Sequence, residues 1–153
     1  MYRGTLIAVA DMEKSREFYC DLLGMEVEAD FGASVQLAGG LTLQSLASWQ
    51  TFIQNRKITK EHNASELYFE VQDIDAFYEK LKAADICFVH GLIEHDWGQR
   101  ACRFYDPDHH MIEVAEDIAT VVKRFYDSGM REIEVAERMD VPLEFVQGCL
   151  KEK

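Results

Sequence analysis

The stretch that decides the fold is Trp97–Glu116, WGQRACRFYDPDHHMIEVAE. Its pattern predicts a strand over Gln99–Tyr105, a tight turn over Asp106–His109 and a second strand over Met111–Val114, because extended apolar segments flank an Asp-Pro-Asp turn. Side chains alternate between the two faces of a strand, so Glu113 faces away from its apolar neighbours. We expect this carboxylate on an open sheet face, where it can bind a metal ion or move a proton.

The composition fits one domain with a helical tail. The 153 residues are 48% hydrophobic, which supports a packed core. The formal net charge of −12 argues against general binding to nucleic acid or to an anionic membrane. No signal peptide is recognised, and no apolar run approaches the ~20 residues that span a bilayer, so a cytoplasmic location is expected. Buried reduced thiols are favoured for the cysteines, which show no CxxC spacing: Cys20, Cys87, Cys102 and Cys149.

The order of the predicted elements occurs twice along the chain. The first copy is a strand, a helix and three strands: Tyr2–Ala10, Met12–Leu23, Met25–Asp30, Ser34–Ala38 and Leu41–Leu46. The second copy has the same order: Glu66–Val71, a helix capped by Asp73 and ending near Ala84, Ile86–Ile93, Gln99–Tyr105 and Met111–Val114. Such a repeat predicts two tandem βαβββ modules of α+β class, at 1–46 and 65–116, joined by a linker at 47–64 with a helical turn.

Residues 117–153 have no strand pattern and are predicted as three short helices. Their middle part resembles a helix-turn-helix in spacing, but Pro142–Lys151 carries Lys151 as its only basic residue and also Glu144. A DNA reader needs basic side chains for phosphates, so we prefer a helical hairpin that packs on the sheet domain or on a second subunit. The packing residues would be Phe125, Val135, Met139, Phe145 and Leu150.

Three blocks of sequence, which together cover nearly all of residues 4–116, resemble the vicinal oxygen chelate superfamily. They are Val9–Gly24 (VADMEKSREFYCDLLG), Phe69–Ile74 (FEVQDI) and Trp97–Glu113 with its FYDPD turn. The superfamily includes glyoxalase I, bleomycin-resistance proteins and extradiol dioxygenases. The resemblance implies that the modules form a curved mixed sheet around a cavity, within one chain or across a homodimer.

The resemblance also implies four metal-ligand positions, on the first and last strand of each module: Gly4, Gln44, Glu66 and Glu113. Gly4 offers no side chain, so the remaining set is oxygen-only. Such oxygens suit Mg²⁺ or Mn²⁺, and the sequence does not distinguish these from Ni²⁺ or Zn²⁺ as the divalent metal ion. A 2-His-1-carboxylate iron site cannot be assembled from these positions, which disfavours dioxygenase chemistry.

Glu113 is the expected catalytic base, because two carboxylates that converge in an apolar cavity raise the pKa of one of them. The alternative is that Glu66 and Glu113 are ion-paired, with Arg100 or Arg103 on the neighbouring strand. These two arginines lie on opposite faces by alternation, so at most one points inward. The expected substrate contacts are Trp97, Arg100, Tyr68 and His90.

Two functions follow from these features. One is a glyoxalase-like lyase or isomerase that uses a divalent cation and a glutamate base. The alternative is a metal-free protein that binds and sequesters a small molecule, a drug or a metabolite, as bleomycin-resistance relatives do. A third, less favoured hypothesis is a ligand-sensing regulator that acts through the helical tail, which would require DNA binding.

Overall fold

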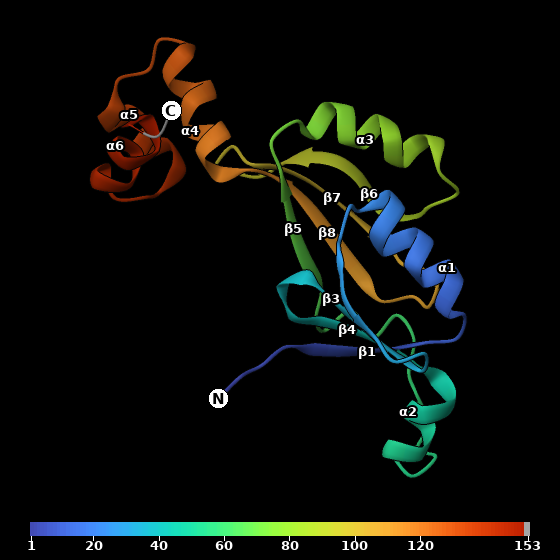
Figure 1. The fold of residues 1–153 in the computed structure, drawn as a ribbon. Coiled ribbons are helices and arrows are strands. Elements are labelled where there is room, and N and C mark those ends of the chain that lie inside the picture. Colours follow the sequence, from blue (N-terminus) through green and yellow to red (C-terminus); the bar gives the residue numbers. More distant parts are fainter. Residues whose placement is uncertain (152–153) are drawn as a thin grey trace. The chain divides into compact units, whose positions relative to one another are not determined.

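The computed structural model describes residues 1–151 and divides them into two compact units. Unit 1 comprises residues 1–66 and 105–111, and unit 2 comprises 67–104 together with the chain from Ile112 onward. Each unit contains a four-stranded mixed sheet with helices, and three helices follow the second sheet (Figure 1). The predicted α+β fold of two tandem modules followed by C-terminal helices is therefore confirmed.

The sheet of unit 1 has the strand order β1-β4-β3-β2, with β1 parallel to β4 and the other neighbours antiparallel. Its helices include α2, which lies in the predicted linker segment. The elements are β1 Thr5–Val9, α1 Met12–Arg16, η1 Glu17–Leu22, β2 Val27–Asp30, β3 Ser34–Leu37, η2 Ala38–Gly40, β4 Leu41–Ser45 and α2 Leu46–Phe52.

The first helix of unit 1 begins at Met12, as the sequence predicts. Asp11 accepts a hydrogen bond from the Lys14 amide at 3.2 Å, which satisfies one of the amides left without a partner at a helix start. The helix then widens into the π-helical turn η1, which buries Phe18 and Tyr19. The sheet contributes the rest of the buried apolar residues: Ile7, Val9, Val35, Leu37, Leu41 and Leu43.

The turn at 105–111 belongs to unit 1, where its Asp side chains accept hydrogen bonds from Tyr19 and Ala10. Buried Asp106 accepts hydrogen bonds from the Tyr19 hydroxyl at 2.7 Å and from the amides of Asp108 and His110 at 2.9 and 2.8 Å. Asp108 accepts from the Ala10 amide at 3.0 Å. Burial raises the pKa of Asp106, but its bonds with His110 and Tyr19 outweigh burial and leave the pKa below its ordinary value.

Unit 2 contains the second sheet, in the order β5-β8-β7-β6, with β5 parallel to β8. The β8 strand runs almost directly into the C-terminal helices (Figure 1). Its elements are β5 Leu67–Val71, α3 Ile74–Ala83, β6 Cys87–Glu94, β7 Arg100–Tyr105, β8 Met111–Glu116, α4 Ile118–Asp127, α5 Glu132–Met139 and α6 Leu143–Lys151.

Helix α3 covers one face of the second sheet. A chain of edge-to-face ring contacts runs from Tyr78 on the helix to Phe88 at 5.7 Å, and from Phe88 to Phe104 at 6.0 Å. Ile112 and Val114 are fully buried, whereas Glu113, which lies between them in the strand, faces the opposite side of the sheet. The predicted orientation of Glu113, away from its apolar neighbours, therefore holds.

The C-terminal helices share a small apolar core. Val135 and Met139 are buried in it, Phe125 and Leu150 pack against it, and Phe145 is 37% exposed. The other buried members are Val121, Val122, Ala136, Val146 and Cys149. No helix within residues 1–151 combines the length and the apolarity needed to cross a membrane.

Candidate functional site

The face of the second sheet opposite α3 carries a charged pair at its centre. Arg103 on β7 forms an ion pair with Glu113 on β8, and the Glu113 residue is 5% exposed. The Arg103 Nη1 also lies 3.4 Å from His90 Nε2 on β6, while His90 Nδ1 lies 2.8 Å from the Gly91 carbonyl. Three neighbouring strands therefore bring a carboxylate, a guanidinium and an imidazole together.

An aromatic group lies beside this pair. The rings of Trp97 and His95 stack, with their centres 4.4 Å apart and their planes 9° apart. Trp97 Nε1 donates to Gln99 Oε1 at 3.1 Å, and Gln99 Nε2 donates to the Tyr68 hydroxyl at 3.1 Å. Tyr68 lies directly across from Glu113 in the β5–β8 register. We call Tyr68, His90, Trp97, Arg103 and Glu113 the sheet site.

The protonation of the aromatic groups follows from their surroundings. Burial lowers the pKa of His95, and electrostatic interactions with Arg103 and His90 lower it further, so the ring stacked on Trp97 is neutral near pH 7. Burial and the hydrogen bond to Glu70 raise the pKa of Tyr68 to about 12. Tyr68 therefore remains a protonated phenol, and its O–H donates to Glu70 Oε1 at 2.6 Å. Since Trp97 is 41% exposed and Tyr68 51% exposed, both can meet a ligand.

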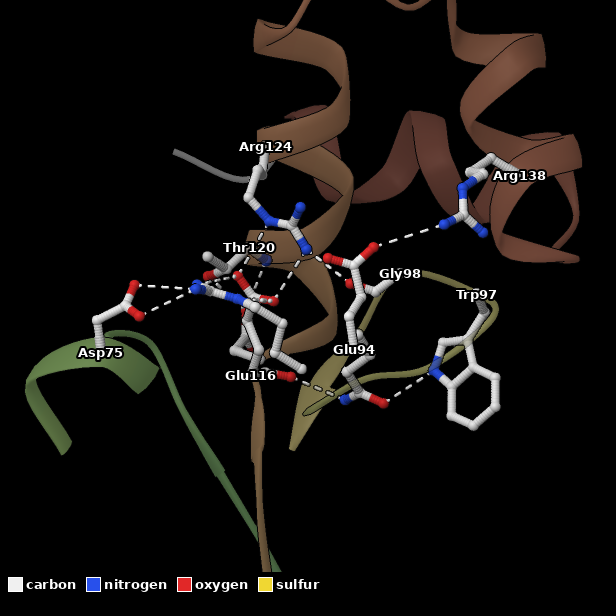
Figure 2. A network of polar contacts seen from close by, with 11 residues as sticks. Asp75, Glu94, Trp97, Gly98, Glu116, Thr120, Arg124 and Arg138 are labelled. Atoms are coloured by element: carbon white, nitrogen blue, oxygen red, sulfur yellow. Dashed lines mark hydrogen bonds and ion pairs between the residues drawn. The ribbon is translucent and has the colours of Figure 1, made fainter. Parts of the chain in front are cut away.

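Arg100, which the sequence placed among the substrate contacts, takes part in a different network. Its Nη1 donates to both carboxylate oxygens of Asp75 at 3.0 Å, and its Nε and Nη2 donate to Glu116 at 3.3 and 3.2 Å (Figure 2). Arg124 on α4 donates to the same carboxylate at 3.1 and 3.2 Å. The structure therefore places Arg100 in a fold-stabilising network and Arg103 in the sheet site.

Helix α4 also holds the loop that carries Trp97. Arg124 Nη2 donates to the Gly98 carbonyl at 2.6 Å (Figure 2). Gly98 has φ +91, and a Cβ atom built on it would lie 2.2 Å from Cζ of Phe125. On the same side, Arg138 reaches Glu94 at 3.5 Å. The C-terminal helices thus fix the backbone next to the exposed Trp97 ring.

The metal-ligand positions implied by the sequence lie in different units. Gln44 and Glu66 belong to unit 1, and Glu113 belongs to unit 2. Gln44 uses its amide nitrogen to donate to the Ala33 carbonyl at 2.9 Å, and Glu113 pairs with Arg103. Within residues 1–151, no group of three or more His, Cys, Asp or Glu residues is placed to hold a metal ion. Gln44 and Glu113 are thus each engaged within their own unit, and the metal site implied by the resemblance stays a prediction.

The strand registers show which residues of the two modules occupy equivalent positions. The sequence paired Gln44 with Glu113. Val9 pairs with Ser45 in unit 1, and Val71 pairs with Glu116 in unit 2. Because Val9 and Val71 begin matching sequence blocks, Ser45 corresponds to Glu116. Three residues earlier in each strand, Glu113 on β8 corresponds to Thr42 on β4, and not to Gln44.

Two polar residues of the second sheet were not predicted as ligand contacts. The sequence named Arg103 only as an ion-pair partner, and Gln99 only as the start of a strand. Strand alternation placed Arg103 opposite Arg100, but it did not say which of the two shares a face with Glu113. The pairing of β7 with β8 in the folded sheet decides this.

Comparison with known proteins establishes the family. Residues 2–119 match the family model described as Glyoxalase-like domain. The chain therefore belongs to the glyoxalase-like domain family, within the vicinal oxygen chelate superfamily. The match ends inside α4, so α5 and α6 lie beyond it.

The chain is similar to several bacterial proteins. It is 32% identical to a solved protein of unknown function from Agrobacterium tumefaciens str. C58, with a TM-score of 0.69 and coverage of 77% of this chain and 94% of that one. It is 28% identical over 117 residues to YraH of Bacillus subtilis (strain 168), covering 71% of this chain and 91% of the relative. A lactoylglutathione lyase from Agrobacterium tumefaciens shares the fold at 20% identity, with a TM-score of 0.59 and coverage of 76% and 92%.

Proposed function

We propose that the sheet site binds a small planar organic molecule without a metal ion. The main support for this proposal is the Arg103–Glu113 ion pair, in which the Arg103 guanidinium, and not a metal ion, balances the charge of the carboxylate. The match of residues 2–119 to the glyoxalase-like domain supports a small-molecule function, since the superfamily that the sequence resembles includes glyoxalase I and bleomycin-resistance proteins.

Each residue of the sheet site has a distinct part in this proposal. The half-exposed ring of Trp97 offers a stacking surface, with neutral His95 fixing its orientation. The half-exposed ring of Tyr68 offers a second flat surface, and the Arg103–Glu113 pair presents charged donors and acceptors to the polar atoms of a ligand. Such a site favours a flat molecule that carries polar oxygens along one edge.

A glyoxalase-like lyase or isomerase with Glu113 as its base is the second candidate. One observation favours it: the Glu113 carboxylate, which would accept a proton from a ligand, is held by Arg103, and Arg103 Nη1 also lies 3.4 Å from His90 Nε2. In that reaction, Arg103 would hold the charge that develops on a ligand oxygen. The divalent cation implied by the sequence would complete the site only with Gln44 and Glu66, and it remains a prediction.

Ligand binding tests the first candidate. Calorimetric titration of the full chain with a library of small planar carboxylates, phenols and diketones should find at least one compound that binds. Trp97→Ala should weaken that binding by about tenfold, because it removes a stacking partner. The matched control is Trp49→Ala, which removes the other tryptophan, on α2 of unit 1. Equal losses in the two variants would contradict the proposal, as would the absence of any bound compound.

A further inference from the structure

A pocket lies within unit 1 and shares no residue with the sheet site, which belongs to unit 2. Its volume is about 400 Å³, which is within the range of small-molecule sites. The segment after α2 forms one wall, and the turn at 105–111 forms another. We call it the linker pocket. The polar residues that line it include Arg56, Lys57, Lys60, His62, His109 and His110.

The linker pocket is lined mainly by basic side chains, although the whole chain is acidic. The sequence has 28 acidic and 16 basic residues, yet three of those basic side chains line this pocket. Its acidic lining residue, Asp108, is buried and is already bonded to the Ala10 amide, with Lys60 4.0 Å away. Among the residues the structure describes, Arg56 and Lys57 form no ion pair. Two cations therefore remain available to a ligand.

The walls of the linker pocket are fixed to each other. The Glu61 amide donates to the His109 carbonyl at 3.4 Å, and the Tyr105 hydroxyl donates to Asn63 Oδ1 at 2.6 Å. Left-handed backbone is concentrated here, with φ of 51 at Glu61, 54 at Asn63 and 68 at His109. Such conformations cost free energy in residues other than glycine and persist where the surroundings enforce them. The pocket is thus held in shape before a ligand enters.

His110 adds an oriented imidazole. Its Nδ1 lies 2.8 Å from Asp106, a buried carboxylate that also accepts from the Tyr19 hydroxyl. Because Nδ1 is occupied, Nε2 is the ring nitrogen through which His110 can meet a ligand. Apolar surface next to these groups comes from Ala8, Leu46 and Ile58.

We infer that the linker pocket is a binding site for a small organic anion, with a phosphate or carboxylate group held by Arg56 and Lys57 and an apolar body against Leu46 and Ile58. Arg presents a planar fork of donors that matches either anion, and Lys adds a point charge. The site shares no residue with the sheet site, and its excess of cations contrasts with the Arg103–Glu113 ion pair there. It therefore does not depend on the proposed function.

Titration with phenyl phosphate and with benzoate, followed by amide chemical shifts of the full chain, tests this inference. Binding of either anion should shift the signals of residues 55–62 and 108–110, and the tighter anion identifies the preferred head group. Phenol, which has the same ring without the charge, should bind at least about tenfold more weakly. Arg56→Gln with Lys57→Gln should weaken anion binding by at least about tenfold.

The matched control is Lys14→Gln with Lys123→Gln, which removes the same charge from two exposed lysines elsewhere. It should change the affinity by less than about twofold, because distant surface charges are screened by salt. Equal weakening by the two double variants would overturn the inference, as would no binding at millimolar anion. Shifts confined to the sheet site, abolished by Trp97→Ala, would also overturn it. Affinities are compared only among variants whose thermal midpoints of unfolding equal that of the unaltered chain.

Discussion

Replacing Arg124 by Gln should both destabilise the protein and loosen the sheet site. The substitution removes two hydrogen bonds to the buried Glu116 carboxylate, at 3.1 and 3.2 Å, and one to the Gly98 carbonyl at 2.6 Å. The Glu116 side chain is 2% exposed, so water does not easily replace the lost donors. Arg100 remains bonded to Glu116, which limits the loss.

The size of the effect can be worked from these contacts. Breaking a buried ion pair costs about 3–5 kcal/mol when the remaining charge has no partner. Since Arg100 keeps Glu116 paired, we expect about 2–3 kcal/mol, in line with hydrogen bonds to charged groups. For a chain of this size, that free energy corresponds to a fall in the thermal midpoint of roughly 4–12 °C. Ligand binding at Trp97 should weaken too, because the carbonyl of the neighbouring Gly98 loses its hydrogen bond from Arg124.

Calorimetry of unfolding and a titration of the sheet-site ligand measure the two effects. The matched control is Arg131→Gln in the same helical extension, where the 76% exposed Arg131 side chain pairs with Glu134 three residues later. Exposed pairs of this kind contribute about 0.3–0.5 kcal/mol. If Arg124→Gln were no more destabilising than this control, or left ligand affinity unchanged, the argument for α4 as a positioning element would be refuted.

Two further predictions concern the same network. Hydrogen bonds from Arg100 and Arg124 outweigh burial and hold the pKa of Glu116 below its ordinary value of 4.5. The stabilisation from the ionised Glu116 is therefore fully present above pH 4.5 and is lost as the pH falls through the lowered pKa. Urea titrations at pH 7 and pH 3 should show this loss of stability, and Glu116→Gln should reduce the loss. Gly98→Ala should cost about 1–3 kcal/mol more than Gly129→Ala, because both glycines have left-handed φ but only Gly98 would press a Cβ against Phe125; equal unfolding midpoints for the two variants would count against the contact.

Local sequence signals predicted the elements of the fold well. Asp11, Asp73 and Asp117 each cap a helix through a side-chain bond to an amide three residues later. These caps need only neighbouring residues, so sequence contains them. The repeated order of strand, helix and three strands likewise predicted both sheets, because each module repeats the same hydrophobic periodicity.

The site was only partly predictable because it depends on pairing between distant strands. Alternation placed Glu113 on the correct face, yet the partner of Glu113 had to be chosen between Arg100 and Arg103. The register that sets Tyr68 across from Glu113 is a property of the folded sheet. Local sequence patterns report on residues a few positions apart, whereas this pairing joins Tyr68 and Glu113, which are 45 residues apart along the chain.

The network around Glu116 was missed for a different reason. The strand β8 was expected to end at Val114, but it continues to Glu116. A glutamate just before a helix is ordinarily solvent-exposed, and nothing local marks it as buried. Its burial follows from two arginines, Arg100 and Arg124, that converge on it from β7 and α4. Only the three-dimensional arrangement reveals such a convergence.

The most direct test of the central claim is the metal content of the purified full chain after dialysis against Mg²⁺, Mn²⁺, Ni²⁺ and Zn²⁺ in turn. Because Arg103 forms an ion pair with the Glu113 carboxylate, we predict far less than one bound ion per chain with each metal. The metal content should be unchanged in Glu113→Gln and in the exposed control Glu28→Gln. One ion per chain that disappears in Glu113→Gln but persists in Glu28→Gln would contradict the account and identify a metal centre at Glu113.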